Sequence, residues 1–106
     1  MPNFIFAYHG GTKPEDETEI EKSMNGWRDW MKNILGDSIV DAGNPVGLSK
    51  TLNQSGVENN GGSNPLSGYT IIKADNMEQA LEMGRGCPIM GEGGSIEVAE
   101  IIELEM

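Results

Sequence analysis

Hydrophobic residues at a spacing of two mark four segments of this chain as β-strands. Residues 3–9 and 68–74 are rich in aromatic and β-branched residues and are apolar on both faces, as central strands of a sheet are. Residues 38–46 form a shorter apolar segment that ends at Gly43-Asn44-Pro45. Residues 95–104 alternate between apolar and polar positions, which predicts a strand with one exposed face.

A spacing of three and four residues between apolar positions predicts a helix that begins near Pro14 and ends at Gly36. The acidic residues after Pro14 suit the positive end of the helix dipole. The apolar stripe that we expect to be buried consists of Ile20, Met24, Trp27, Met31, Ile34 and Leu35. Trp30 lies beside this stripe, so we expect its side chain to be half covered.

A second helix is predicted to begin at Asp75 or Asn76, where Glu78 or Gln79 can complete a capping box. The expected buried residues of this helix are Met77, Ala80 and Leu81. Gly86 ends the pattern.

The segment between the second and third predicted strands has little capacity to form a core. Residues 47–52 are weakly strand-like, whereas residues 54–64 are polar and rich in glycine and asparagine. We expect 54–64 to be a mobile loop or the tip of a hairpin. It is too short to link two domains, so residues 1–106 are interpreted as one domain.

The predicted order of elements is βαββαβ, which is typical of a ferredoxin-like α+β fold. In this topology the first and third strands are central in a four-stranded antiparallel sheet, and two helices cover one face. The other face would leave apolar side chains exposed to water. An open apolar face of this kind indicates a contact surface. We therefore expect a homodimer, an α+β barrel that encloses a cavity near the subunit interface.

Composition restricts the classes of partner. The chain has 7 Lys and Arg residues against 17 Asp and Glu residues, a net charge of −10. A negative surface repels nucleic acid and anionic lipid, so we expect neither as a partner. The single cysteine, Cys87, excludes an internal disulfide and a zinc site built from thiolates, and we expect it to be a small buried residue. The first residues do not resemble an export signal, so we expect a cytoplasmic protein.

His9 and Asp41 are the candidate catalytic residues. His9 is the only histidine, and it ends a predicted central strand just before two glycines, where its side chain could reach the mouth of a cleft. Asp41 lies between apolar residues of a predicted strand. A carboxylate that binds an imidazole fixes its tautomer and supports general acid–base catalysis. The alternative is that His9 binds a loop carbonyl and that Asp41 caps the turn at Gly43.

Three aromatic residues are candidates for binding a ligand. Tyr8 and Tyr69 lie on the two central strands, where their hydroxyl groups could line a pocket, and Trp30 could form its wall. The alternative is that all three serve packing, as aromatic residues usually do. The glycine-rich stretches fit neither a dinucleotide-binding loop nor a P-loop with its lysine. We therefore expect no cofactor and no metal site.

Several motifs resemble the YCII-related proteins, in particular their DGPF-type branch. They are residues 4–11 (FIFAYHGG), the helix with Trp27 and Trp30, and the tail at 87–98. The Asp-Gly-Pro-Phe tetrad itself is replaced by residues 63–66, Ser-Asn-Pro-Leu. The resemblance implies a dimeric ferredoxin-like fold with a cleft near the subunit interface. It also implies proton transfer by a His/Asp pair.

These observations favour a small homodimeric enzyme that acts on a small organic molecule. His9, oriented by Asp41, would act as general base or acid in a lyase, isomerase or elimination reaction. Two alternatives stay open: a non-catalytic module that binds a small ligand or a protein partner, and a structural dimer partner for another enzyme.

Overall fold

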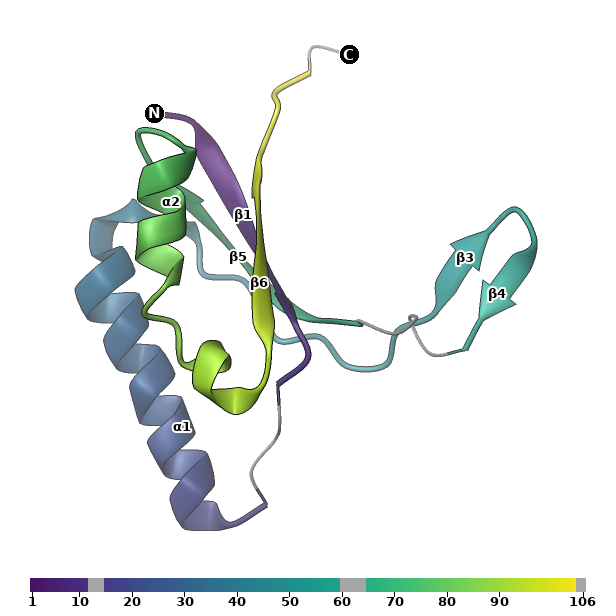
Figure 1. The fold of residues 1–106 in the computed structure, drawn as a ribbon, viewed down its shortest axis with the longest axis horizontal. Coiled ribbons are helices and arrows are strands. Elements are labelled where there is room, and N and C mark those ends of the chain that lie inside the picture. The colour runs from purple at the N-terminus through teal and green to yellow at the C-terminus, as the bar shows by residue number, and fades with distance from the viewer. Residues whose placement is uncertain (12–14, 60–64, 105–106) are drawn as a thin grey trace.

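The protein has an α+β fold in the computed structural model, with helices packed against one face of an antiparallel sheet (Figure 1). The structure describes residues 1–11, 15–59 and 65–104. In chain order its elements are β1 (Asn3–His9), α1 (Glu17–Trp30), the π-helical turn η1 (Met31–Leu35), the 3-10 turn η2 (Gly36–Ser38), β2 (Ile39–Asp41), β3 (Thr51–Asn53), β4 (Gly56–Glu58), β5 (Leu66–Lys73), α2 (Met77–Gly84), the 3-10 helix η3 (Pro88–Glu92) and β6 (Ser95–Glu100).

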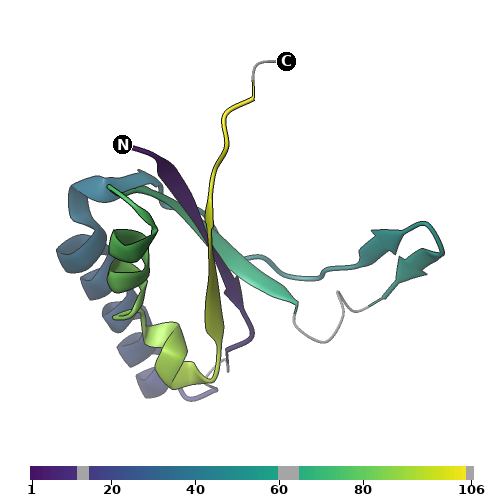
Figure 2. The same ribbon diagram turned by 45° about the horizontal axis from the view of Figure 1, so that its top comes forward.

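The main sheet has the strand order β2-β5-β1-β6, and all neighbouring strands are antiparallel. The two strands that are apolar on both faces, β1 and β5, are central, and the shorter β2 and the alternating β6 are the edges. This arrangement confirms the α+β prediction. Figure 2 shows α1 and α2 on the same side of the sheet, so its other face is not covered by a helix. In the described residues no helix is long and apolar enough to cross a membrane.

The core lies between this sheet and the helices. Alternate residues of β1 point into it, namely Phe4, Phe6 and Tyr8, and Ile72 of β5 packs beside them. Trp30 is only 3 % exposed, which corrects the expectation that it is half covered. Its indole N–H donates to the Met83 carbonyl at 2.9 Å. Trp30 is buried because α2 packs over this side of α1, and helical periodicity alone does not reveal where a second helix will pack.

Several element boundaries differ from the prediction. The first predicted helix is α-helical only to Trp30 and continues as η1 and η2, with Asp16 as its N-cap; Pro14 lies outside the described residues. The strand expected at 38–46 is confined to Ile39–Asp41 and a single bridge between Pro45 and Gly68.

Two further boundaries have clear causes. β6 ends at Glu100 because its partner β1 begins at Asn3, and the last contact is the Ile101 N–H with the Asn3 carbonyl at 2.8 Å. The weakly strand-like stretch becomes part of a hairpin, β3–β4. Residues 60–64 of the predicted mobile loop lie outside the described residues.

The second helix begins as predicted. The Asn76 side chain accepts from the Gln79 N–H at 2.9 Å, and the Gln79 side chain accepts from the Asp75 N–H. Of its expected buried residues only Ala80 is buried, whereas Met77 and Leu81 are exposed. The difference arises because α2 faces the sheet with its small residues, Ala80 and Gly84. Gly84 lies in contact range of Phe6 and Ile96.

Candidate functional site

The open face of the sheet carries the candidate chemistry. Directly paired residues of antiparallel strands lie on the same face, so the registers identify its members. We define the open face by Ile5, Ala7 and His9 of β1, Tyr69 and Ile71 of β5, and Glu97 and Ala99 of β6. All except Glu97 are half-buried. The face therefore has an apolar centre and a polar end where β1 stops.

His9 and Glu97 meet at that polar end. Because His9 pairs with Ser95 and Ala7 pairs with Glu97, the two side chains are diagonal neighbours on the open face. His9 Nε2 and Glu97 Oε1 lie 3.2 Å apart, with side-chain exposures of 14 % and 71 %. An imidazole N–H that donates to a carboxylate is held in one orientation and one tautomer. This pair has the geometry that a proton-transfer group requires.

Glycines shape the backbone at this end of β1. Gly10 follows His9 with φ of 71°, in the left-handed region that side chains rarely adopt, and the strand stops there. A Cβ on Gly94 would lie 2.7 Å from the His9 carbonyl oxygen. The loop before β6 can therefore approach His9 closely only because residue 94 is glycine.

Asp41 is not brought to His9 within one chain. Its carboxylate accepts from the Gly43 N–H at 2.9 Å, as the alternative in the sequence analysis describes. Asp41 pairs with Ile71, which pairs with Ile5. His9 lies four residues beyond Ile5 along β1, a distance of roughly 13 Å at about 3.3 Å per residue. In addition, β5 lies between β1 and β2, the strand that holds Asp41.

Sequence reasoning missed Glu97, which is 88 residues away from His9. In the strand pattern Glu97 occupies an ordinary solvent-facing position. The available signal was topological, because a ferredoxin-like order places the last strand beside the first. Acidic residues on the exposed side of the last strand could therefore have been considered as partners of His9.

The three aromatic binding candidates occupy different environments. Tyr8 is buried, and its hydroxyl donates to Thr70 Oγ1 at 2.7 Å, which donates to the Ala42 carbonyl at 3.0 Å. Trp30 is in the core. Tyr69 is half-buried on the open face. Of these three residues, Tyr69 alone can present its hydroxyl to a ligand on the face that holds His9.

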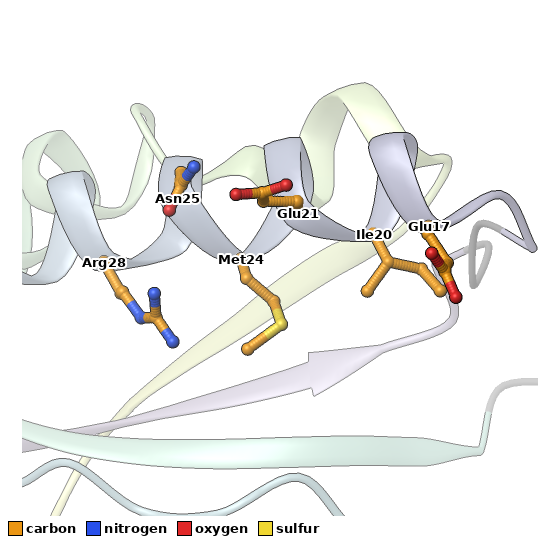
Figure 3. Close-up of a pocket in the computed structure, with 6 residues that line it drawn as sticks. All are labelled: Glu17, Ile20, Glu21, Met24, Asn25 and Arg28. Carbon is orange, nitrogen blue, oxygen red and sulfur yellow. The ribbon is translucent and has the colours of Figure 1, made fainter.

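A shallow hollow of about 330 Å³ lies along α1, away from these residues. Figure 3 shows Ile20, Met24 and Arg28 extending from the same side of α1. Ile20 and Met24 are exposed, which corrects the expectation that they are buried. The cause is that the core ends here: Tyr8 is the last helix-facing residue of β1, and its β5 neighbour is Gly68, which has no side chain. In the described ranges no three His, Cys, Asp or Glu residues are grouped to hold a metal ion.

Two buried groups that can lose a proton, the Cys87 thiol and the Tyr8 hydroxyl, make the free energy of unfolding depend on pH in alkaline solution. Burial raises the pKa of the Cys87 thiol from 9.0 to about 12, with the charge of Glu92 adding to the effect. Burial also raises the pKa of the Tyr8 hydroxyl above its usual value. Above pH 9 the unfolded chain loses these protons while the folded chain keeps them. The free energy of unfolding therefore falls as the pH rises through this window.

We expect the free energy of unfolding to fall by about 1.4 kcal/mol per pH unit for each such group, beginning near pH 9 for Cys87. Urea denaturation at a series of pH values measures this slope. The Cys87→Ala variant should have a lower free energy of unfolding than the wild type at pH 7. Between pH 9 and 11, however, this free energy should fall less steeply with pH in the variant than in the wild type. An equal slope in the variant and the wild type would contradict the assignment to Cys87.

Comparison with models of known protein families gives no match for this chain, and comparison with curated proteins gives none either.

Proposed function

We propose that this protein is a small-molecule enzyme of the YCII-related type, in which His9 transfers protons by general acid–base catalysis. The observation that carries the proposal is the contact of 3.2 Å between His9 Nε2 and Glu97 Oε1 on the open face of the sheet. Glu97 takes the role that the sequence analysis assigned to Asp41. It orients the imidazole and stabilises its protonated form.

The surroundings of the pair support a small organic substrate. Ile5, Ala7 and Ile71 provide an apolar floor for a carbon skeleton, and the Tyr69 hydroxyl can bind a polar group of the substrate. The His9 side chain is 14 % exposed, so it is partly desolvated but still accessible. A lone histidine that removes and returns a proton suits an isomerase, lyase or elimination reaction.

A homodimer joined through the open faces completes the site in this proposal. In the described part of the chain no helix covers the open face, and a second sheet would form the opposite wall and exclude water. By strand register the charged residues on this face are Asp41, Lys73 and Glu97, which sum to −1. Self-association through this face therefore brings little charge together, although the chain as a whole carries −10.

A deuterium-exchange screen tests the enzyme proposal. Small carbonyl compounds and hydroxy acids are incubated with the protein in D2O, and NMR follows the loss of the α-proton signal or the appearance of an elimination product. We expect at least one compound to react faster with the wild-type protein than without it. If a broad set of such compounds reacts no faster with the protein, the acid–base proposal is wrong.

The second candidate is a non-catalytic module that binds a protein or a small ligand. The observation that favours it is the exposure of apolar residues on the β3–β4 hairpin, with Leu52 79 % and Val57 57 % exposed. This candidate predicts that His9→Ala leaves ligand or partner binding unchanged. Isothermal titration calorimetry of the wild type and the variant with the screened compounds separates the two candidates, because a compound that binds both proteins equally and does not react favours the module.

A further inference from the structure

The β3–β4 hairpin stands clear of the rest of the molecule. Figures 1 and 2 both show it extending away from the sheet, on the side opposite α1 and α2. We call residues 47–59, which contain the hairpin, the arm. The arm leaves the sheet next to the start of β5, where Leu66 pairs with His9. It therefore extends from the side of the open face, beside the candidate site.

The arm presents an apolar surface that its own chain leaves uncovered. Leu52 pairs directly with Val57, so both side chains lie on one face of the hairpin. Leu52 is 79 % exposed, Val57 is 57 % exposed, and Leu48 nearby is 90 % exposed. A hairpin of two strands is marginally stable in water unless a further surface packs against it. A surface that covers these residues would therefore stabilise the arm.

The distribution of charge indicates which molecule. Lys50 and Glu58 are the charged residues of the arm, so the arm has no net charge, while the whole chain carries −10. Two copies of so acidic a chain repel each other over most of their surface. The arm is neutral and the open face carries only −1, so neither adds much to that repulsion. Both carry apolar residues that the chain does not fully cover, so each suits the other.

We propose that the arm is an exchange arm that docks on a second copy of this chain. In a two-fold dimer joined through the open faces, each arm packs Leu52 and Val57 against the open face of its partner. The inference rests on the homodimer that we proposed above and adds the element that holds it together. It also accounts for the exposure of Leu52 and Val57 in a single chain.

Sedimentation of the full chain tests the proposal first. We expect a dimer for the wild type, and Leu52→Lys should raise its dissociation constant about tenfold or more, because a charge would be buried at the contact. Ile34→Lys is the matched control, since Ile34 is 52 % exposed but lies on the helical side in η1. The control should leave the dissociation constant unchanged.

Cross-linking locates the contact. Leu52→Cys is labelled with benzophenone maleimide, while native Cys87, which is 3 % exposed, stays unlabelled. Labelled ¹⁵N chains are mixed with unlabelled ¹⁴N chains and irradiated, and mass spectrometry identifies the cross-linked peptides. We expect cross-links between ¹⁵N and ¹⁴N chains at peptides from β1, β5 or β6, the strands that form the open face.

The outcomes distinguish this inference from the proposed function. A wild-type monomer at all concentrations would overturn the dimer and the arm contact together. A dimer that is insensitive to Leu52→Lys, or that gives cross-links within one chain alone, would overturn the arm contact and leave the open-face dimer standing. The deuterium-exchange screen is independent of the two tests of the arm, because His9 and Glu97 meet within one chain and the arm does not contribute to that contact.

Discussion

Replacing His9 with Ala should lower the rate of proton exchange on a reactive compound by about 10²–10⁴-fold, the usual contribution of a general acid or base. The loss follows because His9 is the only histidine of the chain, so no other imidazole can take over. The imidazole lies at the end of β1, outside the core, and we expect the variant to remain folded. Initial rates in D2O, with circular dichroism as the check on folding, measure this effect. A variant that retains the full rate would exclude His9 as the proton-transfer group.

The two carboxylates give a paired test of which residue orients His9. Glu97→Gln should lower the exchange rate by up to about 10⁴-fold, the loss seen when the carboxylate that orients a catalytic histidine is replaced by its amide. Asp41→Asn should leave it unchanged, because an asparagine oxygen can still accept from the Gly43 N–H. Long-range ¹H–¹⁵N spectra report the His9 tautomer directly, and we expect Glu97→Gln to change them and Asp41→Asn to leave them as they are. The reverse result would favour the pairing with Asp41 that the sequence suggested.

The overall fold was predictable because its strongest signals are local. Phe4, Phe6 and Tyr8 alternate with Ile5 and Ala7, so both faces of β1 read as apolar, and the strand is central. The start of α2 was predictable for the same reason, since the capping contacts of Asn76 span only three residues. Patterns of this length depend on the backbone geometry of a single element.

Features that depend on contacts between distant segments were less predictable. The burial of Trp30 depends on α2, which follows it by more than forty residues, and the pairing of His9 with Glu97 depends on β6. Asp41 illustrates the same limit. A carboxylate among apolar residues was interpreted as catalytic, but the turn that it caps, at Gly43, is two residues away. A local role was sufficient to explain it.

The hairpin shows how a polar sequence can conceal an apolar face. Residues 54–64 were expected to be a mobile loop because they contain few apolar residues. In the structure Val57 lies opposite Leu52, and the pairing of β3 with β4 combines two isolated apolar residues into one face. Neither strand carries that signal alone.

Gly43→Ala should lower the free energy of unfolding by about 2–5 kcal/mol. Gly43 has φ of 74°, a conformation that costs an L-residue about 1–2 kcal/mol. A Cβ there would also lie 1.7 Å from the Tyr69 carbonyl oxygen, and relieving such overlap typically costs about 1–3 kcal/mol more. The backbone cannot simply move away, because the Tyr69 N–H donates to the Asn44 carbonyl at 3.3 Å and Asp41 accepts from Gly43 itself.

Gly47→Ala is the matched control for urea denaturation, since it lies four residues further along and a Cβ there would have no heavy atom within 4 Å. We expect its free energy of unfolding to stay within about 0.5 kcal/mol of the wild type. Equal stability of the two variants would show that the chain does not pass so close to β5. Because the turn at Gly43 joins β2 to the segment that leads into the arm, Gly43→Ala should also weaken the proposed dimer. The loss of stability and the loss of association would then have one structural cause, the close approach of this turn to Tyr69 on the open face.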